Sequence, residues 1–133
     1  MILVDSSVLI DLIEQTPQWF AWSAEQLFAA KQRDRIGINA IVFAEMSRTF
    51  SSLSAQNAFL QDTGIAYLPI PAAAAYSASV AHRAYRVAGG SRSATLPDFF
   101  IGAHALVEGF TLMTRDARRM HTYFPDVPVL SPR

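Results

Sequence analysis

Short apolar runs alternate with segments of helical periodicity along this chain, and no other feature constrains its fold as strongly. The runs cover residues 1–4, 36–38, 65–68, 111–113 and 127–130. Between them, apolar side chains recur at helical spacing. They predict a helix that begins near residue 6 and helices over residues 18–32, 40–50, 55–62, 72–87, 97–108 and 115–121. This order predicts one α/β domain over residues 1–133, with a five-stranded parallel sheet and right-handed crossovers.

The first eleven residues predict a buried strand, an acid and the start of a helix. The first apolar run ends at Asp5, and Ser6 or Ser7 is a suitable N-cap for the helix that follows. Because open α/β sheets bind ligands at the carboxyl ends of their strands, Asp5 is a candidate ligand-binding residue. Aspartate also caps helices, and this stretch by itself leaves both interpretations open.

The composition of the chain argues against several kinds of binding site and targeting segment. Eleven basic and eleven acidic residues cancel, so net charge gives no support for indiscriminate binding to nucleic acid or membrane surfaces. The absence of cysteine excludes disulfides, thiolate metal sites and a cysteine nucleophile. The apolar start is broken at Asp5, and the longest uncharged run contains Pro69 and Pro71. We therefore expect neither a signal peptide nor a membrane span, and we expect a cytoplasmic protein.

Three further acids stand out by position. Asp116 lies just past the fourth strand, Asp98 opens the helix before that strand, and Glu45 lies in an apolar helical stretch where it would face inward or into a cleft. Clustered carboxylates repel one another unless cations are present, and Mg²⁺ or Mn²⁺ prefers oxygen ligands. Two such ions can clamp the attacking and leaving oxygens of a phosphodiester. Spacing alone leaves open whether the four acids converge.

The same residues resemble a known family. They are Val4-Asp5-Ser6-Ser7-Val8, Glu45, Leu96-Pro97-Asp98-Phe99-Phe100-Ile101-Gly102-Ala103-His104-Ala105 and Leu112-Met113-Thr114-Arg115-Asp116. In order and spacing, over essentially the whole chain, they resemble PIN-domain ribonucleases, and most specifically the VapC-type toxins of type II toxin–antitoxin systems. The Pro-Asp-x-x-Ile and Thr-Arg-Asp pieces are weak motifs individually. The combination of four acids in this order on a chain of this length is specific.

The resemblance implies a PIN-like three-layer α/β/α fold with strand order 3-2-1-4-5. It implies a metal-dependent endoribonuclease that uses Mg²⁺ or Mn²⁺, with RNA as substrate, an antitoxin protein that covers the pocket, and a second copy in a homodimer. Asp5 and Asp98 would ligate the metal, and Asp116 would do so directly or through water. Glu45 would orient a water on the metal or complete its ligand shell. The hydroxyls of Ser7 and Thr114 would lie beside this pocket.

Other polar residues support weaker predictions. Asp11 and Glu14 are expected on a solvated helix face. The histidines lack zinc-site spacing, and a structural role is expected for His104. Trp19 and Trp22 are expected in the core or at an interface rather than under a nucleobase. Arginines around the acids could contact RNA phosphates, and Arg92 and Arg115 are the candidates, although an ordinary solvated helix would also explain them.

Two alternative functions remain open at this point. An aspartate-dependent phosphatase, of the haloacid-dehalogenase or receiver type, would also place an acid after an early strand, but it needs a lysine after a later one. Lys31 is the only lysine, and its position is wrong for that role. A PIN-like module that only binds other proteins is the second alternative, and the presence of all four acids disfavours it.

Overall fold

The computed structural model describes residues 1–90 and 94–132, which are built on a parallel five-stranded sheet of order β3-β2-β1-β4-β5. The predicted parallel sheet and its order are confirmed, and each strand lies within two residues of its predicted bounds. The strands are β1 (Ile2–Val4), β2 (Ile36–Ile38), β3 (Ile65–Tyr67), β4 (Thr111–Met113) and β5 (Val129–Leu130).

Seven α-helices and one 3-10 turn connect these strands in the described part of the chain. They are α1 (Ser6–Glu14), α2 (Phe20–Arg33), α3 (Ala40–Met46), η1 (Ser47–Thr49), α4 (Leu53–Thr63), α5 (Ala72–Val87), α6 (Leu96–Glu108) and α7 (Arg118–Tyr123). Two predicted bounds are wrong by more than two residues. The helix predicted over residues 40–50 ends at Met46, and the one predicted from residue 115 begins at Arg118.

Local hydrogen bonds accompany both differences between the predicted and observed helix bounds. The Ser47 hydroxyl donates to the Phe43 carbonyl at 2.8 Å and that of Thr49 to the Met46 carbonyl at 2.7 Å, so side chains compete for helix acceptors where α3 tightens. Before α7, the Thr114 hydroxyl accepts from the Asp116 backbone N–H at 3.2 Å, and this bond stabilises a turn where a helix was expected.

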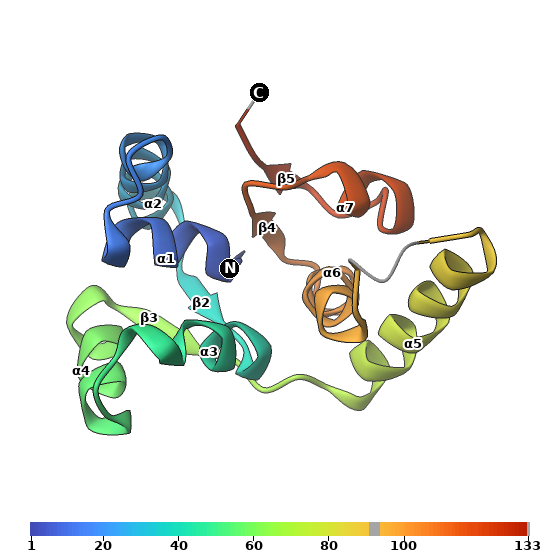
Figure 1. The fold of residues 1–133 in the computed structure, drawn as a ribbon, viewed down its shortest axis with the longest axis horizontal. Helices are drawn as coiled ribbons and strands as arrows, with labels where there is room; N and C mark the ends of the chain where they lie inside the picture. Colours follow the sequence, from blue (N-terminus) through green and yellow to red (C-terminus); the bar gives the residue numbers. More distant parts are fainter. Residues whose placement is uncertain (91–93, 133) are drawn as a thin grey trace.

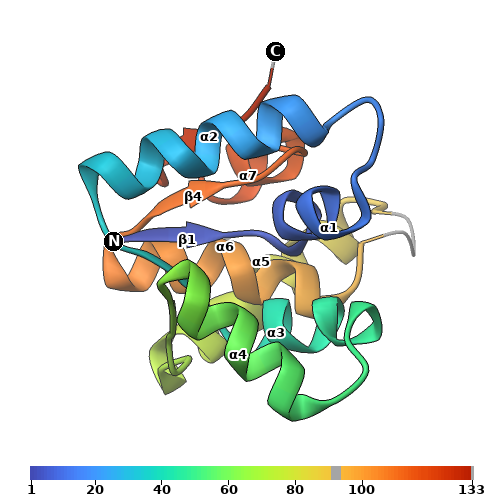
Figure 2. The same ribbon diagram turned by 90° about the vertical axis from the view of Figure 1, so that its left-hand side faces the viewer.

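The helices cover the sheet from both sides, as right-handed crossovers require. Figure 1 shows α1 and α2 on one side of the sheet and α5, α6 and α7 on the other. Strands β1 and β4 run side by side between these layers in Figure 2, in agreement with their pairing. Helix α3 contacts both α1 and α6. None of the described helices has the length and hydrophobicity needed to cross a bilayer.

The core lies along the two central strands. Leu3, Val4, Leu112 and Met113 have no exposed surface, because helices cover both faces of a parallel sheet. On one face α6 approaches α7 so closely that a Cβ on Gly102 would lie 2.4 Å from the Phe124 ring. This close packing fixes α6, which carries Asp98, against α7, which follows Asp116.

Candidate active site

Strand register places Asp5 and Thr114 next to each other at the carboxyl edge of the sheet. Val4 pairs with Met113, and the Asp5 backbone N–H donates to the Met113 carbonyl at 2.8 Å. Asp5 and Thr114, which follow these two paired residues, therefore lie at the same edge of the sheet. There the Thr114 hydroxyl donates to Asp5 Oδ2 at 2.8 Å. The prediction that the ends of the first and fourth strands meet is confirmed.

Asp5 both caps a helix and contributes its carboxylate to this edge. It is the N-cap of α1, where Oδ1 accepts from the Ser6 backbone N–H at 2.8 Å. Oδ2 also accepts from the Ser7 hydroxyl at 3.0 Å. The predicted N-cap at Ser6 or Ser7 is wrong, because both serines lie inside the helix. Ser7 and Thr114 lie beside the carboxylate, as expected from the resemblance.

Glu45 reaches the same edge from α3. Its Oε1 accepts from the Ser6 hydroxyl at 3.0 Å, which joins the start of α1 to the middle of α3. The residue is exposed, so it faces a cleft rather than the interior. The sequence suggested Ser6 only as a possible N-cap and not as a partner of Glu45, although its position directly after the first acid was a usable signal.

Asp98 and Asp116 complete the set from two other elements. Asp98 lies in the first turn of α6, and its Oδ2 accepts from the Thr95 backbone N–H at 2.7 Å in a capping box. Asp116 follows β4, and its Oδ1 accepts from the Arg118 backbone N–H at 3.3 Å. A local hydrogen bond from a backbone N–H thus holds each carboxylate near the start of a helix, α6 for Asp98 and α7 for Asp116.

All four acids line one cavity of about 210 Å³. Asp5 and Asp98 are partly buried, whereas Glu45 and Asp116 are exposed, so the cavity opens to solvent on the side of the latter two. Among the described residues, no three acids or histidines are already close enough to hold a metal ion. The remaining lining residues are Ser6, Ile101, Thr114, Arg119 and Met120.

Electrostatics in this acidic cavity favour a bound cation. Burial raises the pKa of the Asp5 carboxyl above its usual value of 3.8, the three hydrogen bonds oppose this, and the nearby Asp98 adds to it. Although the Glu45 residue is exposed overall, partial burial of its carboxyl raises the pKa of that group; the Ser6 hydroxyl opposes this, and the charges of Asp5 and Asp98 add smaller increases. A divalent cation would offset both effects, and carboxylates and hydroxyls are the oxygen ligands that Mg²⁺ and Mn²⁺ prefer.

Asp11 departs from its prediction. Its side chain is 1% exposed, it accepts from the Ser23 hydroxyl at 3.0 Å, and Arg115 Nε lies 2.8 Å from its Oδ2. The expected solvated face is therefore wrong for Asp11, because its ionic partner comes from the loop after β4. It is correct for the exposed Glu14, which pairs with Arg48 at 3.2 Å.

The arginines predicted to contact substrate lie elsewhere or have another partner. The Arg115 guanidinium pairs with Asp11 and lies 5.3 Å from the centre of the Trp19 ring. Its contact with substrate therefore remains a prediction. Arg92 lies outside the described residues. The arginine that lines the acidic cavity is Arg119, which was not one of the two candidates.

The remaining candidates have structural surroundings. His104 is buried, and its Nδ1 lies 3.1 Å from Asn39 Nδ2, in agreement with the expected structural role. Trp22 packs against the core. Lys31 lines a separate pocket with Asp34 and Arg35, next to the amino end of β2. The structure thus places the only lysine away from Asp5, which disfavours the phosphatase alternative.

The chain matches known proteins in sequence and in structure. The family model of the PIN domain matches residues 2–125. The structure is similar to VapBC-1 from nontypeable Haemophilus influenzae, with 19% identity, 98% of each chain covered and a TM-score of 0.74. VapBC2 from Rickettsia felis shares 17% identity over 100% of each chain, with a TM-score of 0.72.

A third similar structure is FitAcB from Neisseria gonorrhoeae, with 21% identity, 98% of this chain and 96% of that chain covered, and a TM-score of 0.68. No curated protein matches the chain significantly by sequence. The structural likeness supports the fold, and the family model covers most of the chain, including all four acids. The chain belongs to the PIN-domain family.

Proposed function

We propose that the chain is a metal-dependent endoribonuclease and the toxin of a toxin–antitoxin pair. The observation that carries this proposal is the convergence of Asp5, Glu45, Asp98 and Asp116 on one cavity from four separate segments of the chain. Membership of the PIN family and the likeness to the VapBC and FitAcB structures support the same conclusion.

Asp5, Asp98 and Asp116 would hold the metal, which is Mg²⁺ or Mn²⁺. All three offer carboxylate oxygens, and each now accepts hydrogen bonds from its own neighbours. A carboxylate oxygen has two lone pairs, so these hydrogen bonds can persist when a metal binds. When bound, the divalent cation supplies charge that polarises the phosphodiester and lowers the pKa of the attacking water.

The chain's own side chains supply position and proton transfer. Glu45, at the open side of the cavity, would orient the attacking water and take its proton at an Oε atom. Its raised pKa suits a general base, since a carboxylate with a higher proton affinity is a stronger base. The hydroxyls of Ser7 and Thr114 hold Asp5 Oδ2 from two sides, so the Asp5 carboxylate stays aimed at the cavity.

The proposed partners follow from the proposed function. RNA is the substrate, a cognate antitoxin protein covers the acidic cavity, and two copies of the chain form a homodimer. We place the protein in the cytoplasm, where its RNA substrate is found. Expression of the chain alone should arrest growth, and coexpression of the antitoxin should restore it.

A cleavage assay tests the proposal. Purified protein should cut single-stranded RNA with Mg²⁺ or Mn²⁺ and stop when a chelator is added, and Asp98→Asn should abolish cleavage with the fold intact. Asp62→Asn is the matched control, because it makes the same change at an exposed position on α4 and should cut at the parent rate. Cleavage that persists in chelator, or in Asp98→Asn, would contradict the proposal. No cleavage at all would favour a protein-binding module.

A further inference from the structure

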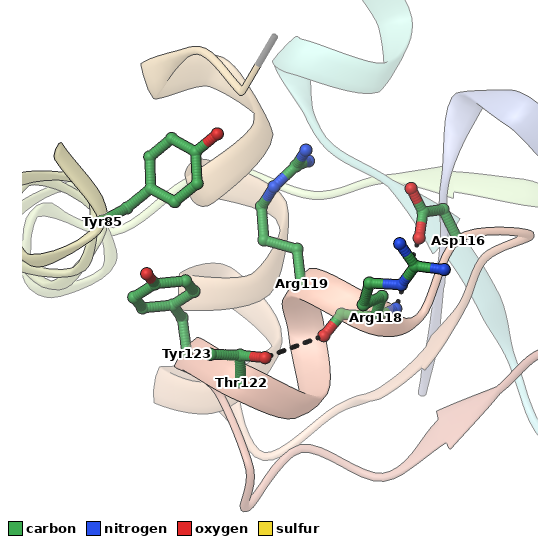
Figure 3. Close-up of a pocket in the computed structure, with 6 residues that line it drawn as sticks. All are labelled: Tyr85, Asp116, Arg118, Arg119, Thr122 and Tyr123. Atoms are coloured by element: carbon green, nitrogen blue, oxygen red, sulfur yellow. Dashed lines mark hydrogen bonds between the residues drawn. The ribbon is translucent and has the colours of Figure 1, made fainter. Parts of the chain in front are cut away.

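A second, larger pocket adjoins the acidic cavity. Its volume is about 510 Å³, and it shares Asp116 and Arg119 with the cavity that holds the four acids. The two pockets are therefore adjacent, and both are bordered by these two side chains. Figure 3 shows the residues that line it, which are Tyr85, Asp116, Arg118, Arg119, Thr122 and Tyr123.

The charge of this second pocket is opposite to that of the acidic cavity. Arg118 and Arg119 contribute two guanidinium groups, whereas Asp116 contributes one carboxylate. Arg119 extends between the Tyr85 ring and Asp116 in Figure 3, and its guanidinium carbon lies 5.9 Å from the ring centre. Arg118 is exposed, so its guanidinium is accessible to a ligand. Arginine pairs with phosphate through two parallel hydrogen bonds.

Aromatic rings form the opposite wall. Tyr85 on α5 and Tyr123 on α7 meet edge to face, with ring centres 5.7 Å apart. Both rings also pack against Phe99, which is fully buried. The centre of the Phe99 ring lies 5.4 Å from that of Tyr85 and 5.6 Å from that of Tyr123. The buried ring fixes the position of this wall. Tyrosine faces and arginine planes are the groups on which proteins stack unpaired bases.

We propose that this pocket binds the nucleotide next to the scissile phosphate of a single-stranded RNA. Arg118 and Arg119 hold its phosphate, and Tyr85 and Tyr123 form the wall against which its base packs. The strand must be unpaired, since an A-form helix keeps base faces stacked and out of reach. This assignment rests on the proposed function, because it takes the acidic cavity as the place where the strand is cut.

The phosphate contacts are tested by binding in the presence of a chelator, which separates them from cleavage. The probe is a fluorescent, unstructured RNA of about twelve nucleotides, a length within the range of single-strand binding sites. Arg118→Ala should weaken binding about ten-fold and reduce its salt dependence by about one ion. Arg33→Ala removes the same charge at the end of α2 and should have little effect.

The aromatic wall is tested on the protein and on the RNA. Tyr123→Leu should weaken binding about ten-fold, whereas Tyr123→Phe keeps the ring and most of the affinity. Scanning a single abasic site along the RNA should reveal one position at which Tyr123→Leu no longer has an effect. A general loss of stability in Tyr123→Leu would weaken the binding of every RNA alike. It would not remove the effect of the substitution at a single abasic position.

The outcomes separate this inference from the proposed function. If the parent binds RNA through Arg118 and Tyr123 but never cuts it with Mg²⁺ or Mn²⁺, the ribonuclease proposal fails, and the pocket stands only as a site that binds single-stranded RNA. If the parent cuts RNA while Arg118→Ala and Tyr123→Leu bind like Arg33→Ala, the pocket assignment is overturned. Unchanged RNA affinity with lost antitoxin binding would assign the pocket to the protein partner and would also overturn it.

Discussion

Two aspartates of helix α1, Asp5 at its N-cap and Asp11 inside the helix, have opposite surroundings. Asp11 is 1% exposed and has a cation of its own, because Arg115 Nε lies 2.8 Å from its Oδ2. Asp5 accepts three hydrogen bonds, but they come from one backbone N–H and two hydroxyls. Its carboxylate also feels the negative charge of Asp98, which contributes to its raised pKa.

The comparison separates a carboxylate whose charge is balanced within the fold from one whose charge a bound cation would balance under the proposed function. Asp11 and Arg115 neutralise each other within the fold, as a buried ion pair must. Three successive residues after β4 contact the two sites. Thr114 donates a hydrogen bond to Asp5, Arg115 pairs with Asp11, and Asp116 lines the acidic cavity. One loop thus completes the structural site and leaves the acidic cavity with an excess of negative charge.

The largest expected effect is on catalysis at Asp5. Asp5→Asn should lower single-turnover RNA cleavage by about a thousand-fold, because a metal ligand is lost while the hydrogen-bonded shape is kept. The same substitution at Asp11 should reduce cleavage far less once the protein is shown to be folded. Equal losses at the two positions would remove the distinction between them.

The largest expected effect on stability is at Arg115. Arg115→Ala should lower the free energy of unfolding by about 3–5 kcal/mol, because it leaves the Asp11 carboxylate buried without a cation. Urea denaturation measures this loss. Adding Asp11→Asn to the same chain should recover much of it, since the uncompensated charge is then gone. A double variant no more stable than Arg115→Ala would show that the ion pair is not the cause.

A smaller loss of activity is expected at Glu45. Glu45→Gln should slow cleavage about a hundred-fold, the contribution of a typical general base, and it should leave the melting temperature close to that of the parent. The metal concentration needed for half-maximal cleavage should change less in Glu45→Gln than in Asp5→Asn, because we propose that Glu45 acts on water rather than as a main ligand. A full loss of metal binding would instead make Glu45 a ligand.

The smallest effect is the response of stability to pH without metal. Because the folded chain raises the pKa of Asp5 above its usual 3.8, it binds that proton more tightly than the unfolded chain does. The free energy of unfolding should therefore fall as the pH rises from 3.8, the usual pKa, through the higher pKa that Asp5 has in the folded chain.

Chemical denaturation in chelator, compared between the parent and Asp5→Asn, isolates this contribution. The variant should lose that part of the pH dependence and should be slightly more stable than the parent at neutral pH. A parent that gains stability relative to the variant as pH rises would contradict the assigned direction.

Much of the fold is visible in local sequence patterns. The runs that form β2 and β4 are short, apolar and followed by Asn39 or Thr114, so their bounds and the polar edge could be predicted. Asn39 caps α3 as expected, and Gly109 ends α6 in a left-handed conformation with φ 73°. These features depend on residues within one or two turns of each other.

The failures depend on residues that are distant in sequence. Nothing near Asp11 reveals that Arg115 will lie against it, so helical periodicity assigned Asp11 to solvent. Nothing near Arg115 in the sequence reveals Asp11 as its ionic partner either, and its contact with substrate stays a prediction. The convergence of the acids was an expectation from the family resemblance, and the strand register that brings Asp5 to Thr114 became visible only in the fold.

The most direct test of the central claim is the melting temperature of the metal-free protein as Mg²⁺ or Mn²⁺ is added at neutral pH. An ion that binds only the folded acidic cavity should raise the parent's melting temperature by about 3 °C or more at saturation. Asp5→Asn should lose most of that increase, whereas Asp62→Asn should retain it. No increase in the parent, or an equal increase in Asp5→Asn, would contradict the assignment of this cavity as the metal site.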